Sequence, residues 1–234
     1  MTSAMPKPPA VLLPGTGSDE VFVRSVFAGP LAAFGIRTQT PAAPRGAAVV
    51  TGLLAALDAA ADGPVIAGGI SLGAHLAAEW AVRNPGRCAG LLLALPAWCG
   101  PPDDAPASLA ARASADLVTE HGLDGALRLA TAGVAPWLAA ELTRAWRRHG
   151  DGLAAGLRVA AAQPAPTLEA LAGLEVPVGI AACTDDPVHP SGVAHSWADA
   201  LPRAVVVETT LDALGADRES LGRATLLAWL RARR

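Results

Sequence analysis

The sequence contains no long apolar run and no block of charge of one sign. A helix that crosses a bilayer needs about 20 predominantly apolar residues, and proteins that bind nucleic acids or membrane surfaces usually carry clustered basic residues. The net charge of the 234-residue chain is only −3. We therefore expect neither a membrane protein nor a nucleic-acid-binding protein. Residues 1–9 are polar and proline-rich, which is typical of neither a signal peptide nor a transit peptide, so we expect a cytoplasmic protein.

Cysteine is scarce, and familiar cofactor motifs are missing. Cys88, Cys99 and Cys183 are odd in number and lack the spacing of metal ligands, so we expect reduced thiols that fill apolar space. The chain has no Walker loop, no G-x-G-x-x-G after a strand and no His/Cys cluster. We therefore expect no cofactor and no metal. We expect a small-molecule substrate as partner, and the protein to be a monomer or a homodimer.

The segment 68–75, Gly-Gly-Ile-Ser-Leu-Gly-Ala-His, organises the rest of the chain. It follows a short apolar run and opens a segment with helical spacing, which is the context of the nucleophile elbow G-x-S-x-G. Gly69 and Gly73 would let strand and helix pass close to a strained serine, Ser71, while the N–H of Leu72 at the helix start faces an oxyanion. The alternative is a small-residue turn that only packs a helix on a sheet. On these residues the chain resembles the α/β-hydrolase family.

Apolar runs alternate with helical patterns along most of the sequence. The resemblance implies an α/β class, the α/β-hydrolase fold, with a mostly parallel sheet of about six strands flanked by helices. The two antiparallel strands that commonly come first in the family have no counterpart here. We expect strands at 10–13, 36–40, 64–67, 88–95, 176–183 and 204–208. We expect helices at 21–34, 47–61, 72–82, 191–201 and 218–230.

Residues 99–175 contain helical patterns but no convincing strand. Helical spacing runs over 108–120, 123–130, 135–149 and 152–162. The resemblance implies a helical cap at 99–175, inserted in a core made of 1–98 and 176–234. Trp98 would leave a strand on the side of the site and line the substrate pocket. The side chains of Trp137 and Trp146 either pack within the cap or line the pocket, and we favour packing. We expect a solvated helix face, rather than an anion site, at Arg144, Arg147 and Arg148.

Two loops at strand ends match further parts of the family pattern. Segment 14–19 follows the first strand, where the resemblance implies a second oxyanion N–H, and we assign it to Thr16. A plain strand–turn–helix connection is the alternative. Segment 184–190, Thr-Asp-Asp-Pro-Val-His-Pro, resembles the acid loop, which makes Asp186 the catalytic acid and Asp185 its neighbour on the solvent side. Here the alternative is a pair of turn aspartates that cap the next helix.

The base of a Ser-Asp-His triad is missing from its usual place. In the family it follows the final strand, but here 209–217 is a loop without histidine, and Ala216 stands in the base position. His189, three residues after Asp186, is the best substitute, with a plain turn residue as its alternative. His75, one helical turn after Ser71, could approach the site and line the pocket, although a core histidine is the simpler interpretation.

The remaining histidines are weaker candidates. We expect His121 and His149 on exposed helix ends and His195 on a surface helix. The first hypothesis is a hydrolase of an ester, thioester or lactone in a small hydrophobic metabolite, with Ser71, Asp186 and His189 catalytic. The alternatives are a lyase, isomerase or cyclase on the same fold, and a catalytically silent binding protein. An engineered Ala216 in place of a native histidine is also possible.

Overall fold

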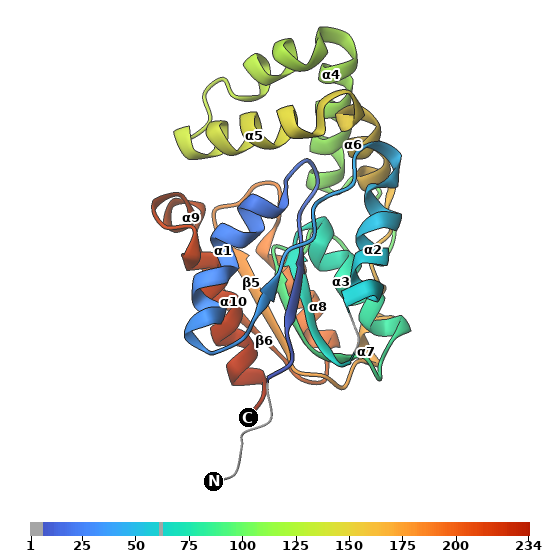
Figure 1. Ribbon diagram of the computed structural model, residues 1–234, viewed down its shortest axis with the longest axis vertical. Helices are drawn as coiled ribbons and strands as arrows, with labels where there is room; N and C mark the ends of the chain where they lie inside the picture. The colour runs from blue at the N-terminus through green and yellow to red at the C-terminus, as the bar shows by residue number, and fades with distance from the viewer. Residues whose placement is uncertain (1–6, 61–62) are drawn as a thin grey trace.

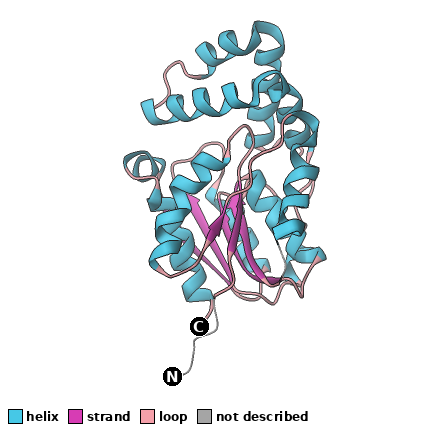
Figure 2. Ribbon diagram, in the orientation of Figure 1, coloured by secondary structure: helices cyan, strands magenta, loops and turns pink. Residues whose placement is uncertain are grey.

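One parallel sheet forms the centre of the molecule (Figures 1 and 2). The computed structural model describes residues 7–60 and 63–234, so most of segment 1–9, the end of the predicted helix 47–61 and the start of the turn 62–64 lie outside the described residues. The strand order is β2-β1-β3-β4-β5-β6, and every neighbouring pair is parallel. The strands are β1 (Ala10–Leu13), β2 (Thr38–Gln39), β3 (Val65–Ile70), β4 (Cys88–Ala94), β5 (Val178–Cys183) and β6 (Ala204–Thr209). The predicted six-stranded, parallel arrangement is confirmed, and the edge strand β2 is shorter than its pattern indicated.

Helices cover both faces of the sheet. Along β1, Ala10 and Leu12 join the apolar cluster with α1 and α10, whereas Val11 and Leu13 join the cluster with α2, α3 and α8. This alternation is the two-residue period of a strand, and burial on both faces explains why the strands read as continuous apolar runs. The helices are α1 (Glu20–Ala33), α2 (Val49–Ala60), α3 (Leu72–Arg83), α8 (Ser191–Ala200) and α10 (Glu219–Ala232), with a 3-10 turn η1 (Gly46–Ala48) before α2.

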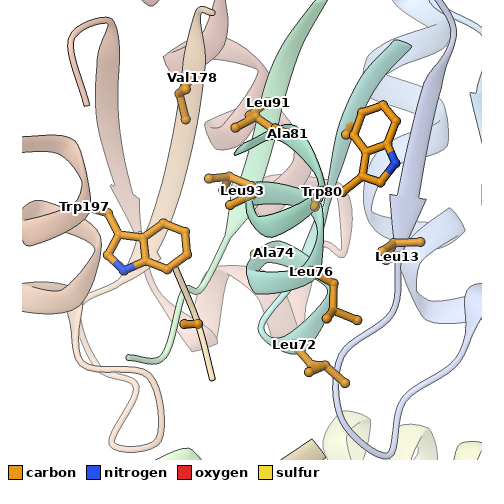
Figure 3. Packing of buried hydrophobic residues seen from close by; sticks show 14 of the residues in the cluster. Leu13, Leu72, Ala74, Leu76, Trp80, Ala81, Leu91, Leu93, Val178 and Trp197 are labelled. Atoms are coloured by element: carbon orange, nitrogen blue, oxygen red, sulfur yellow. The ribbon is translucent and has the colours of Figure 1, made fainter. Parts of the chain in front are cut away.

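Helix α3 lies at the centre of one apolar layer (Figure 3). Its Leu72, Leu76 and Trp80 are buried against the sheet and against neighbouring helices. The indole N–H of Trp80 donates to Asp58 of α2 at 2.9 Å, so this large ring is buried without an unpaired donor. The packing fixes the start of α3 relative to the strand ends.

Between β4 and β5 the chain forms α4 (Pro106–Ala130), α5 (Pro136–His149), η2 (Gly150–Gly152), α6 (Leu153–Ala162) and α7 (Leu168–Ala172). Helices α4, α5 and α6 lie beyond the carboxyl ends of the strands (Figure 1) and share a small apolar cluster that includes Trp146. The two predicted helices 108–120 and 123–130 are one segment broken at Gly122, where φ is 67°. Helix α7 packs on the core instead, because Leu171 belongs to the cluster of α3 and α8.

The segment after β6 differs from its prediction as a loop. It forms a short helix, α9 (Leu211–Ala216). The Thr210 hydroxyl caps it by accepting the Ala213 amide at 3.0 Å, and the Asp185 carboxylate accepts the Leu211 amide at 2.6 Å. The adjacent Thr210 and the distant Asp185 thus satisfy the first amides of α9, which stabilises a helix too short to be stable alone.

Candidate active site

Ser71 lies at a sharp turn between β3 and α3. Its backbone has φ 54° and ψ −115°, a strained conformation for a residue with a side chain, and costs of this kind are about 1–3 kcal/mol. The Ser71 amide donates to Ala94 of β4 at 2.9 Å, which ties the turn to the sheet. A Cβ at Gly69 would lie 2.8 Å from the carbonyl carbon of Gly73, so no side chain fits there. The predicted strand–turn–helix context of the G-x-S-x-G segment is therefore present.

Three of the predicted site residues meet at this turn. His189 Nε2 lies 3.0 Å from Ser71 Oγ, and His189 Nδ1 lies 2.8 Å from Asp186 Oδ2. The other carboxylate oxygen of Asp186 accepts the amides of Val188 at 2.8 Å and His189 at 3.1 Å. The serine, the imidazole and the carboxylate form one hydrogen-bonded chain, the order of groups that activates a serine hydroxyl.

The short acid loop holds both the carboxylate and the imidazole. Burial raises the pKa of Asp186, but the hydrogen bond and charge of His189 and the two loop amides outweigh it and leave the pKa below its usual value. Asp186 is therefore ionised at neutral pH and fixes the proton of His189 on Nδ1, which leaves Nε2 free to accept from Ser71. Its neighbour Asp185 points elsewhere and caps α9.

The two segments whose amides we assigned to the oxyanion hole, the turn after β1 and the start of α3, also lie beside Ser71. A Cβ at Gly15 would be 3.4 Å from the Cβ of Ser71, so the segment after β1 passes directly next to the serine. Within the described residues the Thr16 amide donates to no backbone carbonyl. The Leu72 amide belongs to the first turn of α3, where amides have no partner within the helix. The segment of Thr16 and the start of α3 thus both adjoin Ser71, and the role of their amides stays a prediction.

Comparison with known proteins supports the fold. No family model and no curated protein matches the sequence. Among solved structures, a thermophilic esterase from Thermogutta terrifontis is 19% identical with a TM-score of 0.69, covering 96% of this chain and 90% of its own. An enol-lactonase from Burkholderia xenovorans is 17% identical with a TM-score of 0.68, covering 97% and 93%. A study of carboxylesterases from Nitrososphaera gargenis provides a structure with 13% identity, a TM-score of 0.74 and coverage of 95% and 89%.

The chain has the α/β-hydrolase fold. Within this α/β-hydrolase fold the rings of His121, His149 and His195 contact partners other than Ser71. His195 pairs with Glu208 at 2.9 Å on the surface, and His121 is exposed, as predicted for both. The prediction of an exposed His149 is wrong: its ring is buried, with Nε2 2.8 Å from the carbonyl of Ser18, because α5 packs onto the segment before α1. Ala216 ends α9.

His75 is a core residue of this α/β-hydrolase fold. It has no exposed surface, and its Nε2 accepts the amide of Ala97 at 2.9 Å, which leaves the proton on Nδ1. Its ring lies 4.6 Å from the ring of Trp98, measured between centroids, and 5.6 Å from that of Trp197. Among the described residues Nδ1 has no hydrogen-bond partner. His75 is thus fully enclosed by protein atoms, which is the position of a core histidine. Trp98, which we expected to line the pocket, is also buried, with 6% of its surface exposed.

The burial of His75 gives a testable acid dependence. Burial, together with the charge of His189, lowers the pKa of His75 from 6.5 to about 3. Between these values the unfolded chain binds a proton that the folded chain does not, so the free energy of unfolding decreases as the pH falls from 6.5 towards 3. One proton accounts for at most about 1.4 kcal/mol per pH unit. We expect His75→Gln to remove this contribution, measured by urea unfolding at pH 7, 6, 5 and 4.

His195→Gln is the matched control for this measurement. His195 lies on the surface with half of its side chain exposed, and its loss leaves the buried imidazole in place. The His75→Gln protein is expected to be less stable at pH 7, because the ring contacts with the two tryptophans are lost. An acid slope equal to that of the unaltered protein would contradict the assignment.

The site is covered in this conformation. Ser71 is only 9% exposed. A cavity of about 10 Å³, room for roughly one water molecule, is lined by Thr16 and Gly17 together with apolar residues of α2 and α6. A second, more open cavity of about 190 Å³ lies between α3 and segment 164–170. Ser71 lines neither of these two cavities. The cavity beside Thr16 holds no more than about one water molecule, so a substrate would need a larger space there.

The described residues contain no other obvious centre for chemistry. They hold no cluster of three His, Cys, Asp or Glu side chains that could bind a metal ion, and none of their helices is long and apolar enough to cross a membrane. Cys88, Cys99 and Cys183 are free thiols. Burial raises the pKa of Cys88 to about 11, and burial with the charges of Asp186 and Asp185 raises that of Cys183 to about 12. Neither thiol is therefore a nucleophile at neutral pH.

Proposed function

We propose that this protein is a serine hydrolase that cleaves an ester, thioester or lactone bond in a small hydrophobic metabolite. The single observation that carries the proposal is the hydrogen-bonded chain from Asp186 Oδ2 through His189 to Ser71 Oγ, with separations of 2.8 and 3.0 Å. A binding protein has no need for an imidazole aligned with a strained serine. The similarity to esterase and enol-lactonase structures, at 19% and 17% identity, supports the same reaction class.

The residues have distinct roles in the proposed reaction. His189 Nε2 takes the proton of Ser71 Oγ as Oγ bonds to the carbonyl carbon of the substrate. The carbonyl oxygen becomes an oxyanion, which accepts hydrogen bonds from the amides of Thr16 and Leu72. When the tetrahedral intermediate collapses, the bond to the leaving alkoxide or thiolate breaks, and His189 returns the proton to that group. Water, activated by His189 in the same way, then releases the acid and restores Ser71.

The surroundings of the site extend the proposal. We propose that residues 99–175 are an insertion in a core made of 1–98 and 176–234, and that α4, α5 and α6 of this insertion act as a cap, because they lie beyond the carboxyl ends of the strands. The cap would exclude water from the reacting groups and shape the pocket, with Trp98 near its floor. We further propose that the protein acts in the cytoplasm on a small molecule.

A covalent probe tests the proposal directly. The protein is expected to react with a fluorophosphonate at one residue, identified as Ser71 by peptide mass spectrometry, and to hydrolyse members of a panel of p-nitrophenyl esters, thioesters and lactones. Ser71→Ala removes the nucleophile and is expected to abolish both signals while the protein remains folded by circular dichroism. Absence of labelling and of turnover in the unaltered protein would favour a lyase, isomerase, cyclase or binding protein on the same fold.

A further inference from the structure

The end of α5 is fastened to the segment that carries Thr16. We predicted a solvated face for Arg144, Arg147 and Arg148. Arg148 is 46% exposed, in line with that prediction, but the prediction is wrong for Arg144, which pairs with a buried carboxylate. Arg144 Nε and Nη2 lie 3.1 and 2.6 Å from the two carboxylate oxygens of Asp19, and Arg148 forms an ion pair with Glu20. Asp19 and Arg144 are 125 residues apart in the sequence, so no local sequence pattern predicts that they pair.

Asp19 depends on this contact. Its side chain is 1% exposed, and its Oδ1 also accepts the amides of Val21 and Phe22 at 3.0 and 3.1 Å as the N-cap of α1. Burial raises the pKa of Asp19, but the hydrogen bonds and charge of Arg144, with the two amides, lower it further than burial raises it. A buried carboxylate is stable only while it is paired, so loss of Arg144 would force Asp19 to move or to recruit water.

The anchored residue lies three positions after Thr16. The Ser18 amide donates to the carbonyl of Gly15 at 3.1 Å and closes a turn that contains Thr16. Two further contacts from α5 hold this turn: His149 Nε2 lies 2.8 Å from the Ser18 carbonyl, and the Trp146 indole lies 3.2 Å from the place of a Cβ at Gly17. Contacts from α5 therefore hold the turn that contains Thr16, in addition to its connection to β1.

We propose that Arg144 is a positioning residue: it clamps Asp19 and thereby holds the amide of Thr16 towards the oxyanion. This inference rests on the proposed function, and it places control of the oxyanion hole in α5. An oxyanion exists only in the transition state and the tetrahedral intermediate, so a displaced Thr16 amide slows the reaction without weakening substrate binding.

Arg144→Ala is expected to lower kcat for the best ester about 10- to 10³-fold and to change KM less than about threefold, because removal of one oxyanion donor costs about 10²–10³ in kcat. The affinity for a boronic acid, which forms a tetrahedral adduct with the serine, should fall by a similar factor. Arg147→Ala is the matched control, since Arg147 is on the same helix, is 65% exposed and lies 3.5 Å from the exposed Asp124. Its kcat should stay within about twofold of the unaltered protein.

Two further measurements separate positioning from simple loss of structure. Arg144→Lys keeps the charge but not the two-pronged contact and should give an intermediate kcat. The pair Arg144→Ala with Asp19→Asn removes the unpaired charge while keeping a capping side chain, and should recover part of kcat. Hydrogen exchange by mass spectrometry should show faster exchange in segment 14–20 for Arg144→Ala than for Arg147→Ala.

The outcomes separate this inference from the proposed function. Equal kcat and equal exchange for Arg144→Ala and Arg147→Ala, in a protein that still turns over through Ser71, would overturn the role of Arg144 and leave the hydrolase assignment intact. A rise in KM with unchanged kcat would also overturn it, because that result indicates a substrate-binding residue. Absence of Ser71-dependent turnover in the unaltered protein would instead remove the proposed function, and the exchange result alone would then report whether Arg144 holds segment 14–20.

Discussion

His189→Ala is expected to lower kcat of ester hydrolysis roughly 10³- to 10⁶-fold and to abolish labelling of Ser71 by a fluorophosphonate on the time scale of the unaltered protein. A positioned general base contributes about 10²–10⁴-fold, and removal of the histidine from a working triad costs up to about 10⁶-fold. His189 Nε2 lies 3.0 Å from Ser71 Oγ, and no other histidine ring is hydrogen-bonded to that oxygen within the described residues. Steady-state kinetics and labelling rates measure both effects.

The control is His195→Ala, which removes an exposed histidine paired with Glu208 and should leave kcat within about twofold. The double variant Ser71→Ala with His189→Ala should be no slower than Ser71→Ala alone, because residues that act as one unit are not additive. Labelling that survives His189→Ala at an undiminished rate would assign the base to another group.

The same geometry explains how the chain can lack a histidine after β6. The two aspartates of the acid loop have separate tasks: Asp186 orients His189, while Asp185 caps α9. Helix α9 is in turn held under α5, where a Cβ at Gly215 would lie 2.5 Å from the indole nitrogen of Trp137. Ala216 therefore ends a packed helix, and the imidazole reaches Ser71 from the loop after β5 instead. We infer that the base lies on a different loop in this chain.

Local patterns predicted the sheet and singled out Ser71, Asp186 and His189, which the structure brings together. Strands buried on both faces read as apolar runs, and the elbow and the acid loop are short segments in which the chemistry-bearing residues are close neighbours in sequence. His189 lies three residues from Asp186, so one turn brings the imidazole and the carboxylate together.

Features that depend on distant contacts could not be predicted. The burial of His149 and the pairing of Arg144 depend on where α5 lies relative to the segment before α1, and helical spacing gives no information on that position. Helix α9 is a further example. A six-residue segment has little helical stability of its own, and the local sequence does not show that the Asp185 carboxylate lies at its start.

Gly73→Ala is expected to lower the free energy of unfolding by about 3 kcal/mol or more. A Cβ at Gly73 would lie 2.7 Å from the carbonyl carbon of Leu13 and 2.8 Å from the carbonyl oxygen of Pro14. These are backbone atoms at the end of β1, so they can yield only if the strand and α3 separate. Alanine favours a helix over glycine by about 1 kcal/mol, which is smaller than the cost of such overpacking, so the steric effect wins. Urea unfolding measures the change.

Gly86→Ala is the matched control for this substitution. Apart from the adjacent residues, no atom of the described part of the chain lies within 4 Å of the place of a Cβ at Gly86, so the change is expected to be neutral or to stabilise by less than about 1 kcal/mol. Because the end of β1 leads directly into the turn that contains Thr16, any folded Gly73→Ala protein should also lose kcat, whereas Gly86→Ala should not. A Gly73→Ala protein as stable and as active as Gly86→Ala would contradict the close approach of the end of β1 to α3.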